Sequence, residues 1–305
     1  MPGTTAITPL LAVLPDLGLI ALGALFGRLL TPEAWKALDR LNFQVLFPAL
    51  LFVAASSRPV DPADLLSIGL AVWLIIGVAC AAGYVLRRYG PKQWTDFAGA
   101  WQTSWRFNTA MAFVVVQAFP PAVAGFLAIA VGMAVPFANV LAVSALTRGK
   151  GSVLSRAREV ALNPFLLASL AGVAVALTGT KLPALPNAVV GRLADAALPL
   201  TLLSIGAALD WSKAICFDRF YAGLHLVKLV LLPGLVMLAM LWLDASPPIC
   251  AALILFAALP TASASHVLAA RYGADRSLVA TIVTQSSLIG CLTLPAWCLV
   301  LLLWF

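Results

Sequence analysis

The chain has 305 residues, of which 62% are hydrophobic and only 10% are charged, and its formal net charge is +7. This composition excludes a soluble globular domain of ordinary make-up. The apolar runs are mostly about 20 residues long and lack the alternating pattern of an outer-membrane barrel, so the sequence predicts an all-α polytopic protein in the lipid bilayer.

Ten apolar runs, each bounded by proline, glycine or charge, predict ten transmembrane helices. No basic residue precedes the first run, so we expect a first span there and not a cleavable signal peptide. Five cysteines without paired spacing predict buried free thiols. The predicted spans are residues 10–30, 37–56, 64–86, 96–118, 122–146, 161–178, 188–209, 219–243, 249–270 and 276–303.

Lysine and arginine are distributed unevenly between the two sides of the predicted membrane protein. Of the 19, 14 lie in the connections after spans 1, 3, 5, 7 and 9, whereas Arg58, Lys181 and Arg192 lie on the other side. The positive-inside rule therefore places the basic loop, residues 148–160, in the cytoplasm and both termini outside the cell (inner) membrane. The positive charge thus indicates orientation, and we expect no nucleic-acid partner.

The fourth span is polar at its centre. Residues 102–109 read QTSWRFNT, and Arg106 lies halfway along a segment long enough to cross a bilayer. An arginine there costs roughly 2.5 to 3.5 kcal/mol on insertion scales. One interpretation is an anion site at a helix break, because uncovered backbone is tolerated at membrane depth only beside a protein cavity. The alternative is an arginine that snorkels to the membrane interface.

The two halves of the chain align with each other at an offset of about 150 residues, which indicates an internal repeat. The matched positions, in order, are Pro15 and Pro164, Gly23 and Gly172, residues 46–51 and 197–202, and roughly Pro136 and Pro295. Each half, residues 1–147 and 161–305, has five spans. Because five is an odd number, the second half starts on the opposite side of the membrane and is inverted relative to the first. Inverted repeats are typical of secondary transporters.

The same offset pairs the fourth span with the ninth, which is interrupted at Pro260. Proline removes a backbone donor, and Thr261, Ser263, Ser265 and His266 place polar atoms beside the freed carbonyls. Two broken helices at corresponding repeat positions indicate a binding site. The alternative is a simple proline kink that serine and threonine accommodate.

A series of short motifs follows in order along nearly the whole chain. They are RFNT at 106–109, VPFANV at 135–140, NP at 163–164, ALPLTLLSIG at 197–206, residues 259–273, TQSS at 284–287 and LP at 294–295. Their order, together with ten spans, resembles the auxin efflux carrier family, the bacterial relatives of plant PIN-type carriers, within a wider group that includes the bile-acid sodium symporters.

The resemblance implies a scaffold domain from spans 1, 2, 6 and 7 and a moving transport domain from spans 3–5 and 8–10, with spans 4 and 9 crossing at their breaks. It also implies efflux or exchange of small organic anions, malonate and other carboxylates among bacterial members. Span 4 here lacks the proline that marks its break in the plant carriers, so its break must depend on Asn108 and neighbouring polar residues.

Three cationic or titratable residues carry alternative interpretations. Arg106 suits a carboxylate because its planar fork can donate two parallel hydrogen bonds. Lys228, inside span 8, could balance Asp16 or Asp195, snorkel, or contact a ligand. His266 titrates near neutral pH, so proton coupling through it, or through Lys228, and a neutral packing role are both open.

The remaining candidates are polar residues at the two breaks and in span 10. Asn108 and Asn139 could cap broken backbone or bind ligand, and Gln285 could line the site or join helices. The predicted substrate-binding residues are Arg106, Asn108, Thr109, Pro260, Thr261, Ser263, His266 and Gln285. No catalytic, metal-binding or cofactor motif occurs, so we expect no catalytic residue, no metal ion and no cofactor.

The leading hypothesis is a secondary carrier that moves a small organic anion by alternating access. Spans 4, 5, 9 and 10 have no central carboxylate, so the oxygen cage of a dedicated cation site is not evident, although coupling to a proton or sodium is open. The alternatives are an intramembrane enzyme that uses His266 with Ser263 or Ser265, and a ligand-sensing receptor without flux. A homodimer is compatible with the carrier.

Overall fold

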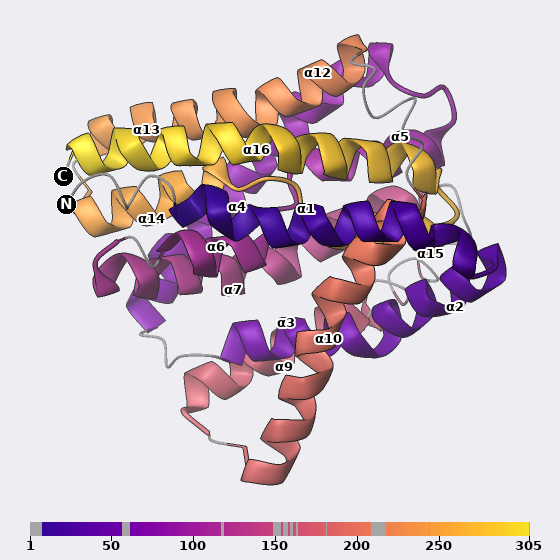
Figure 1. Ribbon diagram of the computed structural model, residues 1–305. Coiled ribbons are helices and arrows are strands. Elements are labelled where there is room, and N and C mark those ends of the chain that lie inside the picture. The colour runs from indigo at the N-terminus through magenta and orange to yellow at the C-terminus, as the bar shows by residue number, and fades with distance from the viewer. Residues whose placement is uncertain are drawn as a thin grey trace.

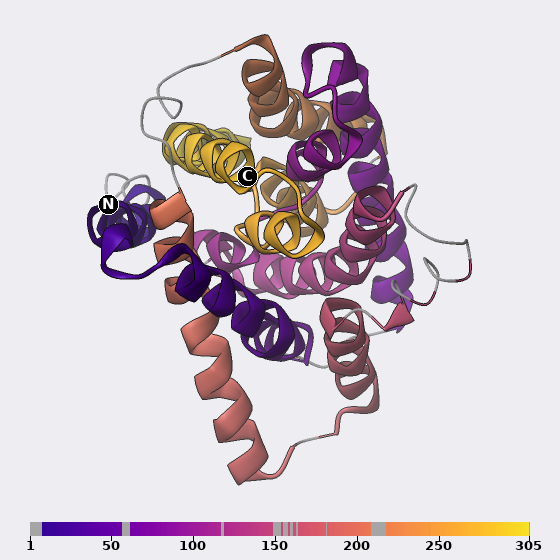
Figure 2. The ribbon, with the colours of Figure 1, turned by 90° about the vertical axis from the view of Figure 1, so that its right-hand side faces the viewer.

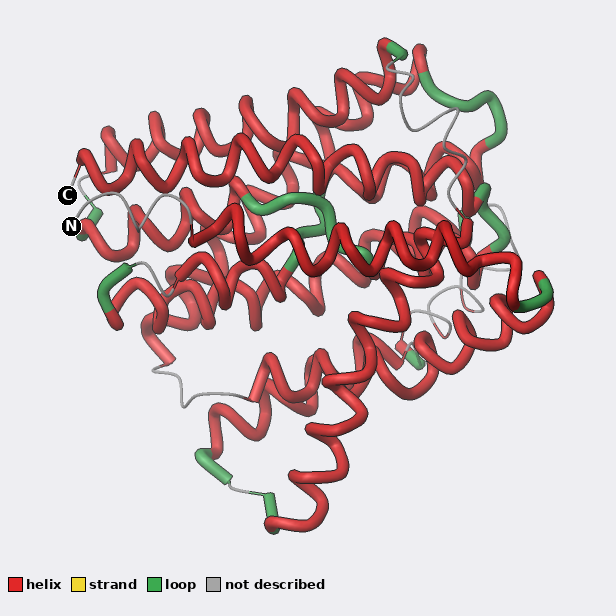
Figure 3. Tube along the Cα trace, viewed as in Figure 1, coloured by secondary structure: helices red, strands yellow, loops and turns green. Residues whose placement is uncertain are grey.

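The computed structural model describes residues 8–56, 62–116, 119–148, 154, 158, 161–162, 164–180, 182–208, 218–243 and 245–304. These residues are almost entirely helical, and strand-like pairing within them is limited to one isolated bridge between Phe107 and Thr261. Figure 3 shows this helical chain, with most loops at the helix ends and further loop segments inside the bundle. The predicted all-α class is confirmed.

The first half of the chain forms helices that differ in length and continuity. Thr31 caps α2 by accepting a hydrogen bond from the Ala34 amide at 3.3 Å, and Pro32 occupies the first helical turn, as is typical of helix starts. A π-helical turn at Asn42–Leu46 continues α2 into α3. The bounds are α1 (Thr8–Phe26), α2 (Pro32–Leu41), α3 (Phe47–Ser56), α4 (Pro62–Val85), α5 (Trp94–Trp101), α6 (Thr109–Val115) and α7 (Pro121–Leu146).

The second half also contains both long and interrupted helices. Asp218 caps α12 by accepting a hydrogen bond from the Tyr221 amide at 2.8 Å, and a π-helical turn at Val227–Leu231 continues α12 into α13. The bounds are α9 (Pro164–Thr178), α10 (Ala184–Ala208), α12 (Arg219–Leu226), α13 (Leu232–Leu243), α14 (Pro247–Ala258), α15 (Ala264–Tyr272) and α16 (Arg276–Trp304).

Each of the ten predicted spans overlaps one helix or two consecutive helices of this structure. Within the described residues, four helices are long and apolar enough to cross a membrane by themselves, namely Leu66–Tyr89, Ala122–Leu146, Arg219–Leu243 and Arg276–Trp304. The other predicted spans are shorter, interrupted or less apolar. A polytopic helical membrane protein is therefore supported, and the number of ten crossings stays a prediction.

The helices pack in two groups. In one group α1 packs against α10, and α3 packs against α9 and α10; in the other, α7 packs against α4 and α14, and α14 packs against α13. Figures 1 and 2 show α9 and the first part of α10 extending to one side of the molecule, away from α12, α13 and α16. In Figure 1, α1 and α16 lie side by side and run in opposite directions.

Two glycines bring α1 and α10 into backbone contact. A Cβ atom added at Gly206 would lie 1.9 Å from the carbonyl oxygen of Ile20, and one added at Gly23 would lie 2.1 Å from that of Leu203. No real side chain fits these spaces without backbone movement, so glycine is required at both positions. Small residues allow such close approach in membrane proteins, where dispersion contacts carry helix association.

Candidate functional site

The fourth predicted span is broken at its centre. α5 ends at Trp101, a 3₁₀ turn covers Gln102–Ser104, and α6 begins only at Thr109. Without a proline, polar side chains stabilise the break: the Asn108 side-chain oxygen accepts a hydrogen bond from the Met111 amide at 3.3 Å, and the Ser104 hydroxyl donates to the Ala79 carbonyl at 3.0 Å. Asn108 therefore caps α6, which was one of its two predicted roles.

The ninth predicted span is broken around Pro260. α14 ends at Ala258 and α15 begins at Ala264, so five residues between them are not helical. Gly290 of α16 makes room for the break, because a Cβ atom there would lie 2.5 Å from the Pro260 ring. The interruption predicted in this span is present, and it exceeds a simple kink.

The two breaks cross and pair through their backbones. The Asn108 amide donates to the Pro260 carbonyl at 2.9 Å, and the Ala262 amide donates to the Arg106 carbonyl at 3.2 Å. Together they form the antiparallel bridge between Phe107 and Thr261. Each break thus supplies hydrogen-bond partners for the buried backbone of the other.

Side chains add further links between the two breaks. The Thr261 hydroxyl donates to the Thr103 carbonyl at 3.0 Å, and the Gln102 amide group donates to the Ser265 carbonyl at 3.1 Å. The Thr261 backbone amide donates to the Ser286 hydroxyl of α16 at 3.0 Å. Thr261 therefore links the second break to the first break and to α16.

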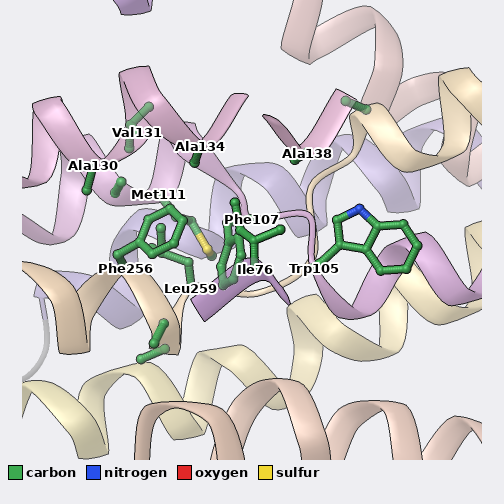
Figure 4. Close-up of a cluster of buried hydrophobic side chains, with 14 of the residues drawn as sticks. Ile76, Trp105, Phe107, Met111, Ala130, Val131, Ala134, Ala138, Phe256 and Leu259 are labelled. Atoms are coloured by element: carbon green, nitrogen blue, oxygen red, sulfur yellow. The ribbon is translucent and has the colours of Figure 1, made fainter. Parts of the chain in front are cut away.

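A cavity of about 40 Å³ lies against the crossing. Its walls come from α3, α7, α10 and α14 as well as from both breaks, and Figure 4 shows Phe107, Phe256, Ala134 and Ala138 among the apolar side chains packed there. The lining residues are Phe47, Leu50, Leu51, Arg106, Phe107, Asn108, Thr109, Ala134, Val135, Ala138, Asn139, Leu198, Phe256, Ala262, Ser263 and Ala264.

Arg106 lines this cavity and is 5% exposed. Its Nε and Nη1 atoms have no hydrogen-bond partner among the described residues, and no carboxylate lines the cavity. The side chain is buried and therefore does not snorkel to the membrane interface. A buried guanidinium without an anionic partner is unfavourable, so an anion in the cavity would stabilise it.

Asn139 of α7 is a cavity residue that the sequence-based set of binding residues did not include. Its side chain is buried, and neither its amide nitrogen nor its amide oxygen has a hydrogen-bond partner in the described part of the chain. Its sequence signal was weak, because a single asparagine in an apolar span more often joins helices. Here the amide lines the same cavity as Arg106.

Lys228 lies in the π-helical turn of α12–α13 and is 1% exposed, which excludes snorkelling. Its ammonium lies 2.9 Å from the centroid of the Phe107 ring, a cation–π contact. Nζ has no hydrogen-bond partner among the described residues, and the predicted counter-ion Asp195 is exposed on α10. The Asp16 side chain is outside the described residues. Lys228 therefore contacts the crossing through Phe107.

The predicted site residues separate into three sets. Arg106, Asn108, Thr109 and Ser263 line the cavity, whereas Pro260 and Thr261 belong to the crossing without lining it. His266, Gln285 and Lys228 do not line it. His266 is buried in α15.

Gln285 has a helix-joining contact. Its side-chain oxygen lies 3.0 Å from Nε2 of His225, so the pair links α16 to α12. This contact agrees with the second of its two predicted roles, which is the more common one in membrane helices.

Comparisons with known proteins point to membrane transport. A family model described as "Membrane transport protein" matches residues 151–298. The chain is also 31% identical over 302 residues to a protein of Rhizobium meliloti (strain 1021) named "Putative malonate transporter", with 92% of this chain and 94% of the relative covered. The chain therefore belongs to this membrane transport family, the auxin efflux carriers, and is a multi-pass membrane transporter, not an enzyme.

Proposed function

We propose that this protein is a secondary transporter that exports or exchanges a small organic anion, with its binding site at the crossing of α5–α6 and α14–α15. The observation that carries the proposal is the buried guanidinium of Arg106, which lines a cavity without a carboxylate partner among the described residues. A substrate carboxylate would accept two parallel hydrogen bonds from such a fork.

The substrate we favour is a short dicarboxylate. The relative from Rhizobium meliloti is named for malonate, and the cavity offers donors besides Arg106, in the amide of Asn139 and the hydroxyls of Thr109 and Ser263. One carboxylate would pair with Arg106, and the second would accept hydrogen bonds from these groups. A monocarboxylate would leave some of them unpaired, which favours the dianion.

The size of the cavity supports a mechanism in which helices move. About 40 Å³ of free space holds roughly three water molecules, so a dicarboxylate requires the walls to separate. We infer alternating access, with α1, α2–α3, α9 and α10 as a scaffold and the other helices as a moving transport body. The packing of α1 on α10 and of α3 on α9 and α10 supports this division.

The proposed architecture is ten spans in two inverted repeats, residues 1–147 and 161–305, joined by a cytoplasmic loop at 148–160. Supporting it, the broken pairs α5–α6 and α14–α15 occupy matching positions, and the helices that follow, α7 and α16, each contain a proline near the aligned position. We further propose the inner membrane as location, with both termini outside. A homodimer is compatible with this arrangement.

Transport of labelled malonate into sealed vesicles that contain the purified protein tests the proposal. We expect exchange of unmodified malonate and, with Arg106→Gln, loss of exchange to the level of empty vesicles. Arg88→Gln is the matched control, because Arg88 is an exposed arginine outside the cavity lining. If the normal protein moves neither malonate nor any other short mono- or dicarboxylate in these vesicles, the proposed substrate class is wrong.

A further inference from the structure

A second polar cluster joins three helices away from the crossing. Arg276, the first residue of α16, forms an ion pair with Asp39 of α2, with 2.7 Å between Nη2 and Oδ2. The Ser204 hydroxyl of α10 donates to the other Asp39 oxygen at 2.5 Å and accepts from Arg276 at 3.2 Å. Asp39 is 5% exposed but Arg276 is 24% exposed, so the cluster lies at a boundary between protein and surroundings.

Arg276 lines two cavities at once, and both are rich in cations. The first, of about 220 Å³, is lined by Lys36, Asp39, Arg40, Phe43, Ala270, Arg271 and Arg276. The second, of about 460 Å³, is lined by Gly27, Arg28, Leu29, Leu30, Thr31, Pro32, Trp35, Ala207 and Arg276. Among the described residues that line them, Asp39 alone is acidic, against five lysines and arginines. This surface therefore carries an excess of positive charge beyond what Asp39 neutralises.

The larger cavity lies where apolar helices end. The apolar helix Gly18–Leu29 ends at Leu29, and the long apolar helix Arg276–Trp304 begins at Arg276, so both cationic residues of this cavity lie at the edge of the apolar layer. The Trp35 indole, which donates to the Gly27 carbonyl at 2.8 Å, is also typical of that depth. The cavity is therefore at the level of lipid headgroups.

The walls of the larger cavity combine charge with exposed apolar surface. Arg28 and Arg276 share it with Leu29 and Leu30, and Leu29 is 77% exposed. A soluble anion would pair with the arginines and leave the leucines in water. A phospholipid satisfies both, because its phosphate pairs with the cations while its acyl chains cover the apolar side chains. Basic pockets at the ends of membrane helices bind anionic headgroups in this way.

We propose that this cavity binds the headgroup of an anionic phospholipid, with the phosphate between Arg28 and Arg276. The proposal is independent of the transported substrate. Because Arg276 also pairs with Asp39, the lipid phosphate and the Asp39 carboxylate share one guanidinium. Lipid binding thereby acts on an ion pair between α2 and α16, to which Ser204 of α10 is hydrogen-bonded.

Native mass spectrometry of the purified protein with added phosphatidylglycerol measures the binding directly. We expect phosphatidylglycerol to bind at least about ten-fold more tightly than phosphatidylcholine with the same acyl chains. Arg28→Gln should weaken phosphatidylglycerol binding about five-fold, since a basic residue near the membrane surface contributes about 1 kcal/mol. Arg88→Gln removes the same charge outside the cavity and should leave binding unchanged.

A second variant is expected to strengthen phosphatidylglycerol binding instead of weakening it. Asp39→Asn keeps the shape of the side chain but releases Arg276 from its counter-charge, so phosphatidylglycerol should bind about five-fold more tightly. Glycerol 1-phosphate, which has the charge without the acyl chains, should not displace the lipid at millimolar concentration. Equal binding of the two phospholipids, equal loss in Arg28→Gln and Arg88→Gln, or displacement by glycerol 1-phosphate would each overturn the proposal.

Discussion

Arg106 combines a fixed backbone with a side chain that lacks a counter-charge. Its carbonyl accepts a hydrogen bond from Ala262 at the crossing, whereas its Nε and Nη1 atoms have no partner among the described residues. The backbone contact holds the guanidinium at the cavity without neutralising it. This separation of the two roles allows the side chain to be changed without loss of the crossing.

We therefore expect substitutions of Arg106 to change affinity more than folding. Arg106→Ala should weaken malonate binding by roughly 2 to 5 kcal/mol, the range for loss of one partner of a desolvated charge pair, and Arg106→Lys should weaken it less because it loses only the bidentate geometry. Calorimetry on the purified variants measures both, after size-exclusion chromatography has shown normal folding. Unchanged affinity in a folded Arg106→Ala protein would place the site elsewhere.

Substitution of Lys228 is expected to affect transport activity but not to lower thermal stability. Its buried ammonium contacts the Phe107 ring but has no hydrogen-bond acceptor in the described chain, so Lys228→Met should leave the melting temperature unchanged or raise it. If the charge takes part in the transport cycle, exchange should fall at least about ten-fold, which is about 1.4 kcal/mol. A variant that melts at a lower temperature and transports normally would assign Lys228 a structural role only.

At the scale of helices, the contact of α1 with α10 is the closest approach described above. The glycines at 23 and 206 face carbonyl oxygens of the opposite helix, so a methyl group would force the two backbones apart. Each proposed repeat supplies one helix of this pair. The contact is thus suited to hold the scaffold together while other helices move.

Gly206→Ala should accordingly destabilise the protein by more than an exposed glycine replacement does. Overpacking typically costs about 1 to 3 kcal/mol, and here the added atom meets backbone, which cannot turn away. Gly191→Ala on the same helix is the control, since a Cβ there has nothing within 4 Å. The melting temperatures of both variants in one detergent test this expectation, and equal values would contradict the described contact.

The sequence predicted which helices are broken better than it predicted which residues surround the breaks. Pro260 marks the second break because a proline interrupts the backbone ladder in any environment. The first break, between Trp105 and Asn108, has no such residue, and its position depends on pairing with a segment about 150 residues away. The sequence left two roles open for Asn139 and did not predict the Asp39–Arg276 pair, because single polar residues acquire a role only from distant neighbours.

The whole molecule should orient with its basic loops in the cytoplasm. The imbalance of 14 to three basic residues predicts this, and a cysteine placed at Gly151, which lies outside the described residues, reports it. In intact cells, a membrane-impermeant maleimide should label cysteines at both termini but not the one at 151. Labelling at 151 before permeabilisation would reverse the orientation.

The coupling of transport to an ion is also a property of the whole molecule. No carboxylate lines the cavity among the described residues, so the negatively charged oxygen ligands of a dedicated cation site are not evident there. We expect malonate exchange to continue when sodium is replaced by choline and to vary with pH. His266→Gln should flatten the pH profile if that imidazole carries the proton. A strict sodium requirement would contradict this expectation.

The paired breaks also have a consequence for biogenesis. The Thr261 hydroxyl meets the Thr103 carbonyl across 158 residues of chain, and at about 5 to 20 residues per second synthesis of that interval takes roughly 8 to 30 seconds. During this interval Arg106 and the exposed backbone beside it have no second break to pair with. The nascent protein must therefore be sheltered from lipid by the insertion machinery until its ninth predicted span arrives.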